Sequence, residues 1–213
     1  MNPRPRKLHF LRWLPKRLLT TRVPRAGRRL YLSFDDGPHP EFTPKVLDLL
    51  AAHGARASFF LVGARAERHP ELVARIVADG HLLGNHSYDH PVFNRLAPAE
   101  QHAQVERTDK ILAAFDGCDE HAFRPPSGVL TLALLADFAR RGRSIAYWSF
   151  DSLDYRRLPA AELAEILRAT PPSGGDIVLM HDDSDVTIAL LETMLPEWRE
   201  QGFALEALPQ HEA

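Results

Sequence analysis

The sequence has one cysteine, no long uninterrupted apolar run and no internal repeat. Because Cys118 is the only cysteine among 213 residues, the chain cannot form a disulfide within itself, which is compatible with a reducing compartment. The apolar stretch over residues 8–19 is interrupted by three cations and a proline. It therefore cannot form a membrane-spanning helix, which needs about 20 consecutive apolar residues.

Acidic residues are missing from the first 29 positions, which hold ten arginines and lysines. The remaining residues hold 16 basic and 28 acidic side chains, against a net charge of −2 for the whole chain. We call residues 1–29 the basic N-terminal arm. Its charge favours contact with an anionic membrane surface or another polyanion, and a solvated tail without a partner is the alternative.

Leucines and Trp13 lie among the cations of the arm, as in interfacial membrane segments, although Pro15 argues against one continuous helix. No small-residue cleavage site follows the arm, so export is not expected. The sequence predicts a cytoplasmic protein, with peripheral contact between the arm and the inner face of the membrane as a further expectation. We expect no nucleic-acid partner.

The rest of the chain, residues 30–208, has the pattern of a single α/β domain. Hydrophobic residues make up 45% and charged residues 25% of the sequence, as in ordinary soluble domains. Apolar runs that predict strands cover residues 30–34, 57–62, 82–86, 121–124, 144–150, 176–180 and 203–207. Segments of helical period lie between them, at 44–53, 66–79, 98–115, 129–141, 159–169 and 186–201.

This alternation predicts a parallel sheet with crossover helices. The arrangements that fit are an open doubly wound sheet and a closed barrel. A full eight-fold barrel usually needs about 250 residues, so a barrel of this length would be trimmed or irregular.

Two adjacent carboxylates, Asp35 and Asp36, end the first predicted strand of the domain. Burial disfavours the charge of each, and each disfavours the charge of its neighbour. An ordinary Asp-Asp-Gly turn is the structural alternative. A bound cation or proton-transfer chemistry would give the pair a function.

Other polar clusters also follow predicted strands at their carboxyl ends. They are His86-Ser87-Tyr88-Asp89-His90, Arg124-Pro125-Pro126-Ser127-Gly128, Asp151-Ser152-Leu153-Asp154-Tyr155 and His181-Asp182-Asp183. Parallel α/β folds assemble their sites on this face. The sequence therefore predicts one shared site.

His86 and His90 are four residues apart, a spacing that lets both imidazoles reach one ion. With one aspartate they would give two nitrogen ligands and one oxygen ligand, leaving coordination positions open. Such a set favours a divalent metal ion. Zn²⁺ is the expected ion, and Co²⁺, Ni²⁺, Mn²⁺ or Fe²⁺ would also fit.

Five short motifs occur in order between residues 30 and 205. They are Ser33-Phe34-Asp35-Asp36-Gly37, His86-Ser87-x-x-His90, Arg124-x-Pro126, Asp151-Ser152-x-Asp154 and Leu179-x-His181. In this order they resemble the motifs of the NodB-homology polysaccharide deacetylases, carbohydrate esterase family 4. The resemblance covers nearly the whole chain. It implies a distorted (β/α)7-type barrel and metal-dependent hydrolysis of an acetyl group, most often N-acetyl, on a carbohydrate.

The resemblance also implies a role for each matched residue. The implied metal ligands are Asp36, His86 and His90. Asp35 would be the general base, oriented by Arg124. His181 would be the general acid, held by Asp154, and Leu179 would line the acetyl pocket. These roles suit amide hydrolysis, which needs a polarised carbonyl, an activated water and a protonated leaving amine.

The chain departs from the family pattern at two positions. Ser127 stands where the family usually has tyrosine, and Tyr155 where it usually has tryptophan. Both positions normally shape the substrate-binding wall, so we expect a wider or more polar pocket, with a backbone N–H near Ser127 still available to an oxyanion.

Two alternative functions remain at this stage. One is hydrolysis of a non-sugar amide by an enzyme of the same superfamily. The other is a non-catalytic module that holds a metal or binds a polyanion through its arm. The complete set of five motifs argues against the non-catalytic alternative, and an assay of acetylated chitooligosaccharides against cyclic amides would separate the two hydrolases.

Overall fold

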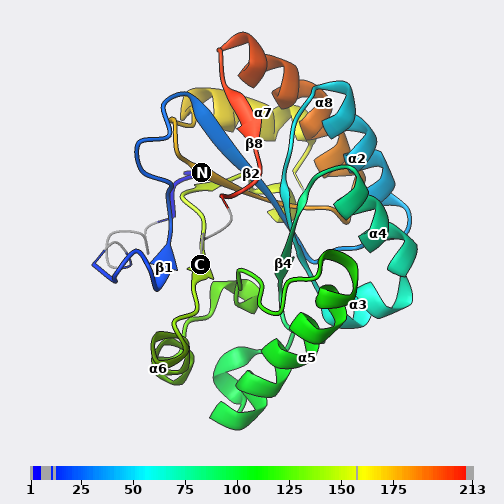
Figure 1. Ribbon diagram of the computed structural model, residues 1–213. Helices are drawn as coiled ribbons and strands as arrows, with labels where there is room; N and C mark the ends of the chain where they lie inside the picture. The colour runs from blue at the N-terminus through cyan, green and yellow to red at the C-terminus, as the bar shows by residue number, and fades with distance from the viewer. Residues whose placement is uncertain (1, 6–10, 12, 157, 210–213) are drawn as a thin grey trace.

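The structure is a computed structural model of the chain. It describes all residues except 1, 6–10, 12, 157 and 210–213. At its centre is a parallel sheet in the order β4-β3-β2-β7-β6 (Figure 1). The central strand is β2, Arg29–Asp35, which is buried from Leu30 onward because helices cover the sheet.

Strand β2 has partners along both edges. The strand β7, Ile177–His181, pairs with it on one side. On the other side, β3, Ser58–Leu61, pairs with its carboxyl half, and β8, Ala204–Glu206, pairs with its first residues. All three pairings are parallel, so these strands end at the same face.

Short segments close the sheet into an irregular barrel. Strand β4, Leu82–Asn85, pairs with β3 and is bridged by Phe123 to β5, Ile145–Ala146. The same chain segment continues into β6, Phe150–Asp151, which pairs with β7. The fold class predicted from the sequence, a distorted α/β barrel, is confirmed.

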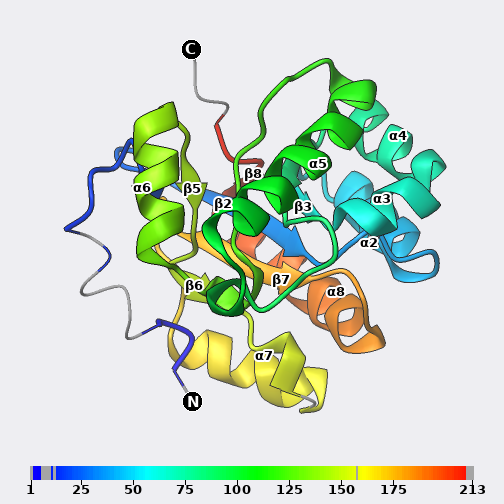
Figure 2. The same ribbon diagram turned by 90° about the horizontal axis from the view of Figure 1, so that it is seen from below.

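Helices surround this sheet (Figure 2). The α-helices are α2 Phe42–Ala52, α3 Gly63–Arg68, α4 Pro70–Ala78, α5 Pro98–Asp116, α6 Leu132–Arg141, α7 Ala160–Ala169 and α8 Asp185–Glu200. Short 3₁₀ turns occupy Phe93–Arg95, Pro126–Gly128 and Asp154–Arg156. Each long helix has apolar side chains at three- and four-residue spacing. In α2, Val46, Leu47 and Leu50 face the core and are fully buried.

The structure differs from the sequence-based elements at three places. The helix predicted over 66–79 is two helices, because Pro70 begins α4 and forces His69 out of helical geometry. The strand predicted over 144–150 is divided into β5 and β6. The strand predicted over 121–124 is reduced to bridges at Phe123.

The described part of the N-terminal arm packs against the barrel. Strand β1, Leu19–Thr20, pairs in parallel with β5. Leu19 is buried beside Phe123 and Ile145 in an apolar cluster, on which the partly buried Leu14 and Leu18 also pack. Trp13 is 80% exposed. No helix among the described residues has the length and apolar character to cross a membrane.

Candidate active site

The carboxyl ends of the parallel strands form one cavity of about 320 Å³. The register of β2 places Asp35 opposite Phe60 of β3 and opposite His181 of β7. Eight of the ten site residues predicted from the sequence line this cavity: Asp35, Asp36, His86, His90, Ser127, Tyr155, Leu179 and His181. The other two, Arg124 and Asp154, lie behind Asp35 and His181 and contact them.

Asp36, His86 and His90 bring three candidate ligand atoms within 4.8 Å of one another. The Nε2 atoms of His86 and His90 lie 3.4 and 3.3 Å from Asp36 Oδ1. Asp36 and His90 have left-handed backbones, with φ of 73° and 55°. That conformation is uncommon outside glycine and is concentrated at functional sites. Here it turns both side chains into the cavity.

The environment of these three residues fits a cation. Asp36 Oδ1 is buried, and although it lies within ion-pair distance of both histidines, it accepts no hydrogen bond. His86 Nδ1 lies 2.7 Å from the carbonyl oxygen of Arg124. Because a carbonyl only accepts, Nδ1 carries the proton and Nε2 is left as a lone-pair donor aimed at Asp36. A divalent ion would satisfy all three groups.

The electrostatics agree with this fit. Burial raises the pKa of Asp36, but contact with His86 and the charges of the nearby histidines outweigh it and hold the pKa well below its ordinary value. Burial and the neighbouring His86 lower the pKa of His90. The carboxylate therefore stays ionised and His90 favours the neutral form, the two states that ligate metals.

Asp35 has a different environment from its neighbour. Arg124 is fully buried and donates through Nη1 to Asp35 Oδ1 at 2.6 Å. The guanidinium is fixed by Ser33 Oγ at 2.9 Å and by two backbone carbonyls. Asp35 Oδ2 lies 3.8 Å from His86 Nε2. One carboxylate oxygen is thus held by a cation, while the other lies beside the histidine cluster.

His181 lies at the end of β7 and is held by Asp154. Its Nδ1 lies 2.8 Å from Asp154 Oδ1, and its backbone N–H donates to Asp154 Oδ2 at 2.7 Å. Thr187 also donates to Asp154 Oδ2, at 2.9 Å. Burial lowers the pKa of His181, but the hydrogen bond to Asp154 and nearby carboxylates outweigh it and raise the pKa to about 10. At neutral pH His181 is protonated and can donate a proton from Nε2.

The remaining wall holds the two residues at which the chain departs from the family pattern. Ser127 is exposed, with φ of 52°. Tyr155 is 49% exposed and meets the His181 ring edge-on at 5.7 Å. Trp148 and Leu179 also line the cavity.

Sequence reasoning missed residues that support the site from behind. Ser33 anchors Arg124, and Thr187 anchors Asp154. The side chain of Asn85 accepts from Ser87 N–H and donates to Asp109, which fixes the loop between the two histidines. Of these, Asn85 and Ser33 carry a local signal, since Asn85 directly precedes His86 and Ser33 begins the motif that contains Asp35.

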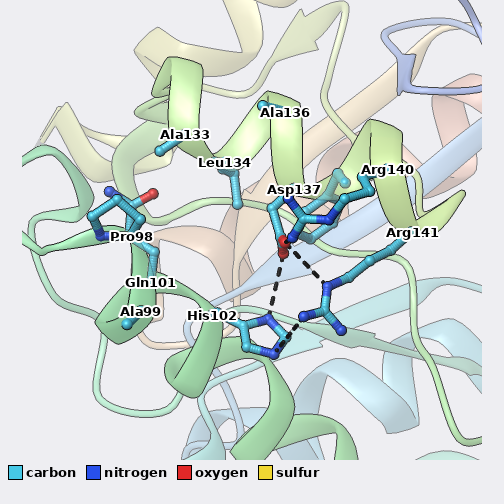
Figure 3. A pocket seen from close by; sticks show the side chains of 11 residues that line it. Pro98, Ala99, Gln101, His102, Ala133, Leu134, Ala136, Asp137, Arg140 and Arg141 are labelled. Carbon is cyan, nitrogen blue, oxygen red and sulfur yellow. Dashed lines mark hydrogen bonds and ion pairs between the residues drawn. The ribbon is translucent and has the colours of Figure 1, made fainter.

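A separate cavity lies between α5 and α6 (Figure 3). There His102, Asp137 and Arg141 point toward one another. His102 Nδ1 lies 3.4 Å from Asp137, and Arg141 contacts both residues. Asp137 and Arg141 form an ion pair that His102 also contacts, and none of the ten predicted site residues lines this cavity.

The barrel and its site define a class of protein. Two histidines and a carboxylate form a metal-type cluster, with a second carboxylate held by arginine and a histidine held by aspartate in the same cavity. These groups are typical of an α/β-barrel hydrolase that combines a bound cation with acid–base catalysis.

The chain belongs to the polysaccharide deacetylase family, whose model matches residues 22–145. It is 36% identical over 200 residues to the chitooligosaccharide deacetylase of Bradyrhizobium sp. (strain ANU 289), covering 86% of this chain and 90% of that protein.

Solved structures agree with this assignment. The Bc1960 peptidoglycan N-acetylglucosamine deacetylase superposes with a TM-score of 0.87 at 30% identity, covering 93% of this chain and 94% of that one. A CE4 family pseudoenzyme from Bacillus anthracis superposes with a TM-score of 0.82 at 26% identity, over 93% of this chain and 69% of its own. The fold is therefore shared by active and inactive proteins. Activity in this family depends on the side chains of the site and not on the fold alone.

Proposed function

We propose that this protein is a divalent-metal-dependent hydrolase that removes N-acetyl groups from an oligosaccharide or glycan precursor. The observation that carries the proposal is the grouping in one cavity of Asp36, His86 and His90 between two acid–base pairs. The relatives named as chitooligosaccharide and peptidoglycan N-acetylglucosamine deacetylases support an amino-sugar substrate. Zn²⁺ is the ion that this ligand set favours.

The residues divide the chemistry among them. When bound by Asp36, His86 and His90, a divalent ion supplies Lewis acidity that polarises the amide carbonyl and lowers the pKa of water. Asp35 accepts the proton of the attacking water, and the hydrogen bond from Arg124 orients this carboxylate. The water oxygen forms a bond to the acetyl carbon.

Departure of the sugar amine completes the reaction. Breaking the carbon–nitrogen bond needs a proton on the nitrogen, because an unprotonated amide anion is a poor leaving group. Protonated His181 lies in the same cavity and donates that proton, and Asp154 stabilises the imidazolium. The products are acetate and the free amino sugar. Leu179, Ser127 and Tyr155 form the wall against which the acetyl group and its sugar lie.

The metal requirement is tested by chelation and reconstitution. Treatment with EDTA should abolish acetate release from N-acetylated chitooligosaccharides, and Zn²⁺ or Co²⁺ should restore it. Metal should also raise the melting temperature, because it binds the folded site and not the unfolded chain. His90→Ala should lose both effects. Full activity in metal-free protein would contradict the metal dependence.

The role of Asp35 is tested by Asp35→Asn. The variant keeps the size of the side chain but removes the proton acceptor, so kcat should fall by about 10²- to 10⁴-fold. Zinc should still bind, because the three proposed ligands remain. Asp89→Asn, a change at an exposed acid in the loop before His90, is the matched control and should keep activity. Undiminished turnover by Asp35→Asn would reject the proposed role, and preference for a cyclic amide would reject the sugar substrate.

A further inference from the structure

A second cavity, of about 460 Å³, adjoins the active-site cavity. The two share four wall residues: Ser127, Trp148, Asp151 and Tyr155. The outer wall of the second cavity includes Asn2, Arg4 and Pro5. These residues lie in the basic N-terminal arm, outside the segment that matches the family model.

The start of the chain is fixed to the barrel at the site itself. The carbonyl oxygen of Pro3 accepts a hydrogen bond of 2.7 Å from the backbone N–H of Asp151, in β6. Pro3 is buried. Figures 1 and 2 show the first residues, in dark blue, lying against this side of the barrel. Because Asp151 lines both cavities, this hydrogen bond ties the arm directly to their common wall.

Arg4 provides the second anchor. Its guanidinium lies 3.1 Å from the fully buried carboxylate of Asp176 and donates to Pro171 O and Ser173 Oγ in the loop after α7. Its Cζ also lies 5.6 Å from the centre of the Phe150 ring. Asn2 Oδ1 accepts from the backbone N–H of Arg4 at 2.9 Å. A half-buried arginine paired with a buried carboxylate and two further acceptors fixes the segment before any ligand arrives, which lowers the ordering cost of binding.

The walls of the cavity suit a sugar ring. Tyr155 presents a half-exposed aromatic face, and Trp148 stacks on Tyr147 at 4.0 Å. Aromatic faces pack against the C–H faces of pyranoses. Asn2 and the exposed Arg156 add polar groups that can bind hydroxyls, the usual combination in a small-molecule site. Ser127, which lies between the two cavities, has a short side chain that leaves the passage between them open.

We propose that Asn2–Pro5 form the outer wall of a second sugar subsite, which holds the sugar joined to the one being deacetylated. This inference rests on the proposed function. It predicts a substrate of at least two sugar units, recognised in part by residues of the arm.

The test compares substrates of different length on full-length variants. Arg4→Ala removes one of the two anchors of Asn2–Pro5, and Arg156→Ala removes an exposed polar group of the cavity wall. For each variant, kcat/KM toward the tetramer of N-acetylglucosamine should fall about tenfold. A loss of this size is expected when one or two hydrogen bonds to the substrate are removed. The kcat/KM toward N-acetylglucosamine itself should stay unchanged.

Arg22→Ala is the matched control. Arg22 also approaches Asp176, at 3.6 Å, and donates to a carbonyl of the same loop, but it does not line the cavity. It should therefore reproduce any loss of stability in Arg4→Ala while leaving the preference for the tetramer intact. Melting temperatures of all three variants separate unfolding from loss of the subsite.

Isothermal titration calorimetry of the N-acetylglucosamine tetramer with the Asp35→Asn variant measures binding separately from hydrolysis. Weaker binding in Asp35→Asn/Arg4→Ala, with binding kept in Asp35→Asn/Arg22→Ala, supports the subsite, and it does so even if the wild-type protein releases no acetate and the proposed function fails. Equal losses for all substrate lengths, no loss in Arg4→Ala, or no binding of the tetramer by Asp35→Asn would overturn the inference.

Discussion

Asp35 and Asp36 are neighbours with identical side chains and opposite surroundings. Asp35 is the last residue of β2 and faces the guanidinium of Arg124. Asp36 leaves the strand with a left-handed backbone and faces His86 and His90. The turn at the strand end therefore gives one carboxylate a fixed cationic partner and places the other beside the two histidines with which we propose it binds a metal. Separate environments allow adjacent acids to take separate roles.

The protonation of His181 is likewise set by its surroundings, here by its pairing with Asp154. Since the pair raises the pKa of His181 to about 10, this proposed general acid should stay protonated across the neutral range. Asp154→Asn removes the negative charge, so the pKa of His181 should fall and the alkaline limb of the kcat/KM profile should move to lower pH. Acetate release measured from pH 6 to 11 checks this shift.

The pair also predicts a dependence of stability on pH. A histidine whose pKa rises on folding stabilises the protein fully below its unfolded pKa of 6.5, and this contribution is lost as pH rises through about 10. The melting temperature of Asp154→Asn should vary less over this window than that of the wild type. Asp183→Asn, which removes a neighbouring exposed charge without touching the hydrogen bond, is the control. An unshifted alkaline limb in Asp154→Asn would reject the proposed coupling.

At the scale of elements, α5 holds the carboxyl end of β4 in place. Asn85 donates to Val105 O and to Asp109 Oδ1 on α5, and its own oxygen accepts from Ser87 N–H. Asp109 is buried and is also paired with Arg143 at 2.6 Å. Burial raises the pKa of Asp109, but hydrogen bonds from His121, Arg143 and Asn85 outweigh it and lower the pKa. The charged network thus positions the loop that carries both histidines.

Asn85→Ala tests this link between helix and site. It leaves buried partners unsatisfied, so the free energy of unfolding should fall by about 3 kcal/mol. The loop should also lose its fixed shape, and zinc affinity should weaken by about 10- to 100-fold. Urea unfolding and zinc titration measure the two effects. Lys110→Ala, an exposed change on α5, should alter neither, and unchanged zinc affinity in Asn85→Ala would show that the loop does not need this support.

At the scale of the whole molecule, the arm is joined to the barrel at two separate places. Its beginning is bound to β6 and to Asp176, and β1 is paired with β5. Composition alone describes this segment as basic and suited to anionic surfaces. In the structure, several of its leucines instead complete an apolar cluster on α5, α6 and β5.

Leu19→Ala tests the packing of the arm. Leu19 is 3% exposed, so truncation should lower the free energy of unfolding by about 3 kcal/mol, as for other buried leucines. Urea denaturation gives the value. Leu132→Ala, at a residue 86% exposed, is the matched control and should change stability little. An unchanged midpoint for Leu19→Ala would mean that the arm adds nothing to the stability of the domain.

Much of the architecture follows from sequence patterns that are local. The buried runs at β2, β3 and β7 and the helical periods between them predict the parallel fold, because crossover connections leave few alternatives. The short closing strands are less predictable. Phe123 joins the sheet through single bridges, and neither its neighbours nor their periodicity reveal where a strand will be interrupted.

The order of polar residues after each strand was enough to predict that Asp35, His86 and His181 meet in one cavity, because parallel strands all end at one face. Tertiary structure alone decided how those groups are supported and extended. The anchors Ser33, Thr187 and Asp109 come from distant positions in the chain, as does Pro3 at the common wall. Such contacts depend on how the chain packs. Packing brings together residues that are far apart in the sequence, and no sequence pattern links them.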